Sequence, residues 1–118
     1  MKSYIFKLFK ILGIKNLFYY FSFFYKNLFG VKPKDYLILK NFYQQYIKKD
    51  QLVFDVGANI GNRALVFRDL GARVIAFEPN PDLFSVLKYR FGDSIEIVNK
   101  GIGLKDEILE FNIASKIL

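Results

Sequence analysis

A chain of 118 residues, 53% of them hydrophobic, is long enough for one domain with a real core and is too apolar for a disordered protein. It contains neither cysteine nor histidine, which excludes disulfides, thiolate metal sites and histidine acid–base chemistry. The net charge of +7 is uneven, because residues 1–49 hold ten lysines and one acid whereas acids slightly outnumber bases in residues 50–118. The composition therefore predicts a basic, aromatic-rich helical segment over 1–49 and a second domain over 50–118.

Residues 1–30 combine lysines with many phenylalanines and tyrosines, and their longest uncharged run is 16–25. That run is too short for a transmembrane helix, which needs about 18 apolar residues, and the lysines around it argue against a signal peptide. We expect amphipathic helices, broken near Gly13, that pack on the domain with their lysines in solvent. The alternative is an interfacial helix on an anionic membrane surface, with its aromatic rings at the level of the lipid headgroups.

These features also bear on partners and localisation. Nucleic acid is not expected as a partner, because the chain has only four arginines and none of them precedes residue 63. The sequence predicts a cytoplasmic protein. Under the alternative interpretation, residues 1–30 would make it peripheral to the inner face of the membrane.

A helix is predicted from Asp35, which can cap its N-terminus, to about Lys49. Its apolar residues recur at helical spacing: Leu37, Ile38, Phe42, Tyr46 and Ile47. Lysines in the last turn suit the negative end of the helix dipole.

A strand, a glycine turn, a helix and a second strand follow. Residues 52–56 are short and apolar, as a central parallel strand should be. Gly57 and Gly61 interrupt the pattern, and glycine permits the positive φ and the close backbone approach that a ligand-binding turn needs. A helix over 62–70 and a strand over 73–77 come next, and the right-handed crossover rule makes the two strands parallel. The same patterns then predict a helix over 81–90, a strand over 94–99 and another strand over 108–113.

Two acids stand at the ends of the first two strands. Asp55 lies near the carboxyl end of the first strand, and Glu78 directly follows the second. Ligands of open α/β sheets bind at this edge. Glu78 can accept hydrogen bonds from both hydroxyls of a ribose, and Asp55 can hold a cationic amine. A dinucleotide or phosphate site would need G-x-G-x-x-G or a P-loop, and neither is present, since Asn59 stands where the second glycine should be. An adenosine with a zwitterionic tail fits better, namely S-adenosylmethionine.

Three segments carry a family resemblance: Asp55-Val-Gly-Ala-Asn-Ile-Gly-Asn62, Ala76-Phe-Glu-Pro-Asn-Pro81 and Val98-Asn-Lys-Gly-Ile-Gly103. Over about residues 50–113 they resemble class I S-adenosylmethionine-dependent methyltransferases of the FkbM type. The resemblance implies an α/β, Rossmann-like core with strands in the order 3-2-1 plus one extra strand. The implied cofactor-binding residues are Asp55, Gly57, Ala58, Asn59 and Gly61 around the methionine and ribose, Glu78 at the ribose, and Pro79 and Asn80 beside the adenine.

The resemblance further implies O-methylation of a small-molecule or glycan acceptor, a sugar or a secondary metabolite. It names no catalytic residue, and no metal is expected. The sequence stops soon after the third strand, so we expect only the cofactor-binding half to be present and the isolated chain to be a poor catalyst. Strand 52–56 would then be an exposed apolar edge that can pair with another chain.

Several alternatives remain open at this point. The two turn glycines can serve packing alone, and Glu78 can be a solvated acid at a strand end. Asn80 and Asp82 are expected to be helix caps rather than ligands. Arg63 is expected on a solvated face, although it could pair with the cofactor's carboxylate, and Lys100 is a long cation where a small residue is usual. The alternative function is a non-catalytic scaffold fragment with a membrane-associating N-terminus, and a nicotinamide-dependent oxidoreductase is disfavoured by the missing glycine.

Overall fold

The computed structural model describes residues 21, 30, 32–110 and 112, and the chain divides into two compact units, Met1–Pro33 and Lys34–Leu118. Most of the first unit, including the predicted amphipathic helices and their membrane contact, lies outside the described residues. Phe21, which is helical and exposed, is an exception. Within the part of the chain that is described, no helix is long and apolar enough to cross a membrane.

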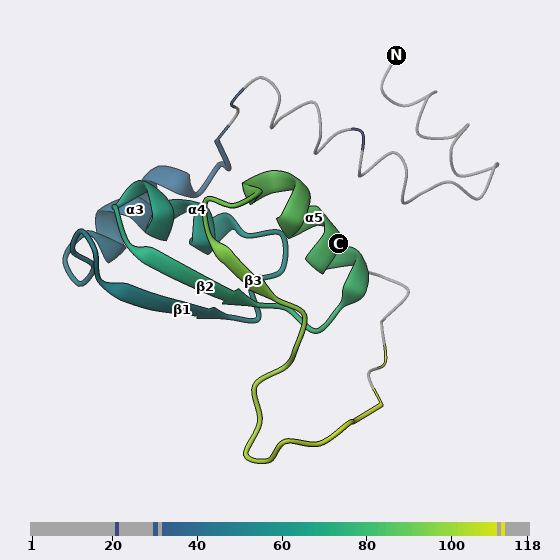
Figure 1. Cartoon of the computed structure of the whole chain (residues 1–118). Coiled ribbons are helices and arrows are strands. Elements are labelled where there is room, and N and C mark those ends of the chain that lie inside the picture. The colour runs from purple at the N-terminus through teal and green to yellow at the C-terminus, as the bar shows by residue number, and fades with distance from the viewer. Residues whose placement is uncertain (1–20, 22–29, 31, 111, 113–118) are drawn as a thin grey trace. The chain divides into compact units, whose positions relative to one another are not determined.

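The second unit contains a three-stranded parallel sheet in the order β1 (Leu52–Val56), β2 (Arg73–Phe77), β3 (Glu96–Val98). Helix α4 (Asn62–Asp69) connects β1 to β2, and helix α5 (Pro81–Phe91) connects β2 to β3. Each connection leads to the next strand on the same side, from β1 to β2 and from β2 to β3. Because crossovers between parallel strands are right-handed, both helices cover the same face of the sheet (Figure 1). The predicted bounds of β1 and β2 are confirmed, and the predicted order 3-2-1 is this order read from the β3 edge.

The hydrophobic core lies between this sheet face and the two helices. Side chains on the helix-facing side of the strands are buried, namely Val74, Ala76 and Ile97, and they meet buried residues of α4 and α5. The most enclosed core side chains include Ala64 and Val66 of α4 and Leu87 of α5. The opposite face of the sheet is different, because Leu52, Phe54 and Val56 are all more than half exposed there.

Helix α3 (Tyr36–Tyr43) packs against α4 and belongs to the same unit as the sheet. The Tyr43 ring meets the Phe67 ring edge-on at 4.8 Å, and the Tyr36 hydroxyl donates a 2.5 Å hydrogen bond to Asp69. Burial and this bond to Asp69 raise the pKa of Tyr36 to about 12. The structural division therefore falls before α3, and it does not coincide with the change in composition near residue 50.

The helix predicted over 35–49 is shorter than expected. It ends at Tyr43, and the Asp35 side chain makes no capping hydrogen bond. After the helix, the Gln45 side-chain amide donates to the carbonyls of Asn41 and Phe42, which satisfies acceptors of the last turn. The expected apolar set is also largely exposed: Leu37, Ile38, Phe42 and Tyr46 face away from the core, and Tyr36, Leu39, Tyr43 and Ile47 pack against it. Periodicity identified a helix with two apolar stripes and could not tell which stripe meets α4.

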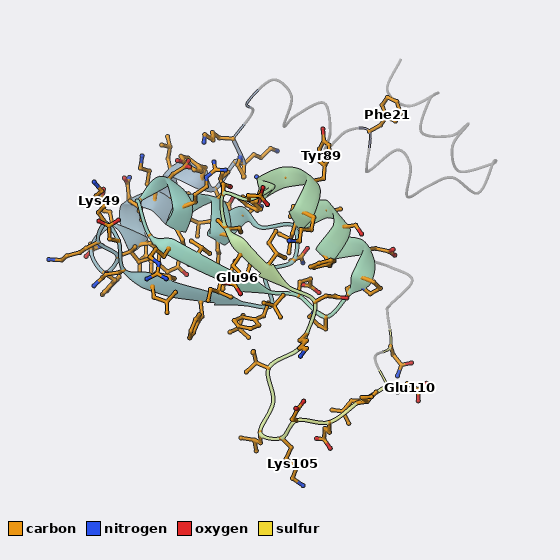
Figure 2. All side chains as sticks on the ribbon, in the orientation of Figure 1. Phe21, Lys49, Tyr89, Glu96, Lys105 and Glu110 are labelled. Atoms are coloured by element: carbon orange, nitrogen blue, oxygen red, sulfur yellow. The ribbon has the colours of Figure 1, made fainter. Side chains whose placement is uncertain are left out.

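The C-terminal predictions need two corrections. The third strand spans three residues, Glu96–Val98, rather than 94–99. The strand expected over 108–113 is absent from residues 108–110 and 112, while 111 and 113 lie outside the described residues. Figure 2 shows the chain leaving the sheet after β3 toward Lys105 and then running to Glu110, away from the strands. Ile108 is fully exposed there. The segment alternates as a strand would, but it has no neighbouring strand among the described residues to pair with.

Candidate functional site

The glycine turn between β1 and α4 is held against the end of β2. The backbone amides of Gly57 and Ala58 both donate to the carbonyl of Phe77, at 3.0 Å each. Three residues of the turn have positive φ: Gly57 at 69°, Asn59 at 56° and Gly61 at 84°. Glycine adopts this conformation freely and asparagine tolerates it, so the sequence Gly-Ala-Asn-Ile-Gly suits the turn.

Glu78 joins the two loops at the carboxyl ends of β1 and β2. Its side chain is buried, one oxygen accepts the amide of Asn59 at 2.8 Å, and the other accepts the amide of Asn80 at 2.9 Å. The interpretation of Glu78 as a solvated strand-end acid is therefore wrong. Each carboxylate oxygen has a second lone pair that these two bonds leave unused.

The loop after β2 is closed by two asparagines. The Asn80 side chain is buried and caps α5 by accepting the amides of Asp82 and Leu83 at 2.9 and 3.5 Å, as predicted. Asp82 itself is exposed in the first turn and is not the cap. Sequence reasoning missed the other asparagine, Asn99, whose amide nitrogen donates to the carbonyls of Glu78 at 2.8 Å and Pro79 at 3.2 Å. Its position just after β3, next to the end of β2, is a signal that could have found it.

Asp55 and Arg63 form an ion pair at the end of β1. Nε and Nη2 of Arg63 lie 3.0 and 2.9 Å from Oδ1 of Asp55, and Nη2 also donates to the carbonyls of Val56 and Gly57. The Asp55 side chain is 2% exposed, and the Arg63 side chain is 43% exposed. The sequence pattern predicted that Arg63 lies on a solvated face. Its guanidinium is instead paired with Asp55 and is only partly exposed. Oδ2 of Asp55 has no hydrogen-bond partner among the described residues.

The environment of Asp55 disfavours its charge. Burial raises the pKa of this carboxyl, and Arg63 and the nearby Ala64 amide only partly oppose the rise. A carboxyl whose pKa is higher in the folded state contributes stability below its unfolded pKa, and that contribution is lost as pH rises through the folded value. We therefore expect Asp55→Asn to increase the free energy of unfolding at pH 7, by on the order of 1 kcal/mol.

Urea unfolding of both proteins between pH 3 and pH 8 tests this expectation. The advantage of Asp55→Asn should shrink as the pH falls from neutral through the raised pKa of the folded state, and it should be gone by about pH 3.9, below which the carboxyl is protonated even in the unfolded chain. A variant less stable than the wild type at pH 7 would show that the ion pair with Arg63 outweighs the cost of burying the charge.

Helix α5 approaches the glycine turn closely and supports it. A Cβ on Gly61 would lie 2.4 Å from Cε2 of Phe91 and 2.8 Å from Cδ2 of Leu87. Nη1 of Arg90 donates to the carbonyl of Ile60 at 2.7 Å and to Oδ1 of Asn62 at 2.9 Å. Burial lowers the pKa of Arg90 to about 10, and the guanidinium stays charged at neutral pH.

An open groove of about 500 Å³ is lined by residues of β1, of α4, and of the end of α3 with the segment that follows it. Asp55 and Arg63 are the charged residues of its lining. Its remaining lining is mostly aromatic and aliphatic: Tyr43, Tyr46, Ile47, Val53, Phe54, Val56 and Phe67. The groove therefore joins the Asp55–Arg63 pair to an apolar surface along the strand.

All eight predicted cofactor-binding residues come from two adjacent loops. Asp55, Gly57, Ala58, Asn59 and Gly61 belong to the end of β1 and its turn, while Glu78, Pro79 and Asn80 follow β2. The third motif lies next to them, since a Cβ on Gly101 would sit 3.9 Å from Cβ of Pro79, and Lys100 is exposed. Among the described residues there is no cluster of three acids that could hold a metal ion.

Comparisons with known proteins add little to this picture. No family model matches the chain, and no curated protein matches it. Among solved structures, a Clostridium thermocellum protein provisionally assigned as an rRNA methylase is similar, with 16% sequence identity and a TM-score of 0.48. The match covers 52% of this chain and 38% of that one, so it spans well under half of that protein's length. A likeness this remote supports no functional argument, which must come from the site itself.

Proposed function

We propose that the loops after β1 and β2 bind S-adenosylmethionine, and that the chain is the cofactor-binding part of a class I methyltransferase of the FkbM type. The observation that carries the proposal is the pair of buried carboxylates, Asp55 and Glu78, on neighbouring parallel strands with a glycine turn between them. A nucleotide that places phosphate here would meet two buried acids. A ligand with a ribose and a cationic tail would meet complementary groups.

The residues at the site fit such a cofactor. Oδ2 of Asp55 lacks a partner among the described residues and would accept a hydrogen bond from the ligand's ammonium group. The half-exposed guanidinium of Arg63 would bind the carboxylate of the same amino-acid tail, so the ion pair suits a zwitterion. Glu78 would accept a ribose hydroxyl through its remaining lone pairs, with Pro79 and Asn80 beside the adenine.

The bound cofactor would supply a methyl group on a sulfonium centre, which a nucleophilic oxygen attacks in line. The chain's own contribution is positioning, which is worth about 7–11 kcal/mol when reactants are well aligned. We propose a hydroxyl of a sugar or secondary metabolite as the acceptor. No described residue is assigned as its base, so the proposal concerns the cofactor site.

Calorimetric titration of the purified chain with S-adenosylhomocysteine tests the proposal. We expect saturable binding that Asp55→Asn weakens about 10-fold to 100-fold, because a hydrogen bond to a charged group contributes about 1.5–3 kcal/mol. The matched control is Asp82→Asn, an exposed acid on α5 whose substitution should leave the affinity unchanged.

A second ligand distinguishes contacts to the amino-acid tail from contacts to the nucleoside. Methylthioadenosine lacks the amino-acid tail, so Asp55→Asn and Arg63→Gln should weaken its binding much less than that of S-adenosylhomocysteine. A folded wild-type chain that binds neither ligand would refute the proposed function. Equal weakening for both ligands would refute the assigned roles of Asp55 and Arg63.

A further inference from the structure

A partly buried charge on α5 lies outside the set of residues that would contact the ligand. Arg90 is in the last turn of the helix, and burial lowers its pKa to about 10, so its guanidinium is charged at neutral pH. Moving a charged group out of water costs free energy that an aliphatic side chain of similar length would not cost. The contacts of the guanidinium therefore indicate what this charge contributes.

One nitrogen of this guanidinium joins the glycine turn to the start of α4. Nη1 of Arg90 donates to the carbonyl of Ile60 at 2.7 Å and to Oδ1 of Asn62 at 2.9 Å. Ile60 belongs to the turn, Asn62 is the first residue of α4, and Gly61 between them has a left-handed backbone. The two bonds therefore span the junction at which the chain changes from turn to helix. Hydrogen bonds from a charged donor are roughly twice as strong as those between neutral groups.

The same helix also holds this junction on its apolar side. The Phe91 ring lies so close to Gly61 that a Cβ there would be 2.4 Å from Cε2. The guanidinium carbon of Arg90 is 5.6 Å from the centroid of this ring, and that of Arg68 on α4 is 5.5 Å from it. Both distances are within the range of cation–π contacts. Arg90 is therefore packed on a buried ring that itself contacts the turn, which fixes the direction of its reach toward Ile60.

We propose that Arg90 is a positioning residue for the ligand site, an inference that rests on the function proposed above. Acceptors at the end of β2 and just after it hold the amides of residues 57–59, which fixes the first part of the turn. Arg90 fixes the second part through the carbonyl of Ile60. It also holds Asn62, and the next residue is Arg63, which would bind the ligand's carboxylate. Arg90 therefore sets the position of a ligand-binding side chain without touching the ligand.

Calorimetric titration of the full chain with S-adenosylhomocysteine tests the inference. Arg90→Met keeps an apolar contact with Phe91 but removes the donor, and we expect it to weaken binding by about tenfold or more, because a small displacement of a binding group is costly. Arg90→Lys should recover most of the lost affinity, since one ammonium nitrogen can donate to both acceptors. The matched control is Lys88→Met, which removes an exposed cation from the same helix and should leave the affinity unchanged.

Hydrogen exchange of the ligand-free chain distinguishes this role from general support of the fold. The amide of Gly61, which donates to the carbonyl of Ala58 at 2.9 Å, should exchange faster in Arg90→Met than in the wild type. The amides of β2 should exchange at the wild-type rate. Faster exchange throughout β2, together with no recovery of affinity in Arg90→Lys, would overturn the inference.

The failure of this inference differs from the failure of the proposed function. If Arg90→Met binds S-adenosylhomocysteine as tightly as the wild type does, Arg90 is not a positioning residue, and the proposed function stands. If the folded wild type binds no S-adenosylhomocysteine, the proposed function is refuted, and the role of Arg90 at a ligand site is refuted with it.

Discussion

Gly61→Ala is expected to destabilise the second unit by about 2–5 kcal/mol. The left-handed backbone at φ 84° costs a residue with a Cβ about 1–2 kcal/mol, and overpacking adds about 1–3 kcal/mol. The overpacking is severe, because the new Cβ would lie 2.4 Å from Phe91 and 2.8 Å from Leu87. Both partners are buried and cannot simply swing into solvent. Urea unfolding at neutral pH measures the loss.

Gly57→Ala is the matched control in the same turn. Gly57 also has positive φ, at 69°, but nothing lies within 4 Å of the Cβ that alanine would add. Its cost should be limited to the backbone term of about 1–2 kcal/mol. Equal losses for the two variants would mean that α5 moves away from the turn and that the contact with Phe91 carries no strain.

These two glycines show what the sequence could and could not reveal. Both interrupt an apolar pattern in the same way, so the sequence predicts a turn at Gly57 and Gly61 and gives them similar roles. The difference comes from α5, which approaches one and leaves the other open. Local patterns predicted β1, β2, α4 and α5 closely because each pattern matches the period of its own element. Which residues meet across elements depends on the packed arrangement.

The same limit explains the parts of the site that were missed. Arg63 lies in the first turn of α4, and only the folded glycine turn brings its guanidinium to Asp55. Asn99 bonds to the loop after β2 because β3 runs parallel to β2 and ends beside it. The strand expected near Ile108 failed for a related reason. Alternation shows that a segment can be a strand, whereas a strand also needs a neighbour.

The two buried acids are therefore not equivalent, although the sequence treats them as a pair. Both oxygens of Glu78 accept backbone amides from the two loops, so this carboxylate is satisfied without a ligand. Asp55 has one oxygen paired with Arg63 and one without a partner among the described residues. We infer that Glu78 fixes the two loops relative to each other, whereas Asp55 forms a hydrogen bond with the ligand. A binding test based on Glu78→Ala alone would confuse loss of a ligand contact with loss of the turn.

Glu78→Ala is accordingly expected to destabilise the ligand-free protein by about 3–5 kcal/mol. The change leaves the amides of Asn59 and Asn80 without their acceptor, and a hydrogen bond to a charged group contributes about 1.5–3 kcal/mol. Unfolding in urea without any ligand measures the effect. The matched control is Glu96→Ala, an exposed acid on the neighbouring strand, which should change stability by less than about 0.5 kcal/mol.

The contrary result would be equally informative. If Glu78→Ala unfolds with nearly the wild-type free energy but no longer binds S-adenosylhomocysteine, the carboxylate is a ligand group and the amides of Asn59 and Asn80 are satisfied by water. Water can take over only if the loops open, because the Glu78 side chain is 5% exposed in the closed arrangement. Faster hydrogen exchange of these two amides in the variant would show that opening directly.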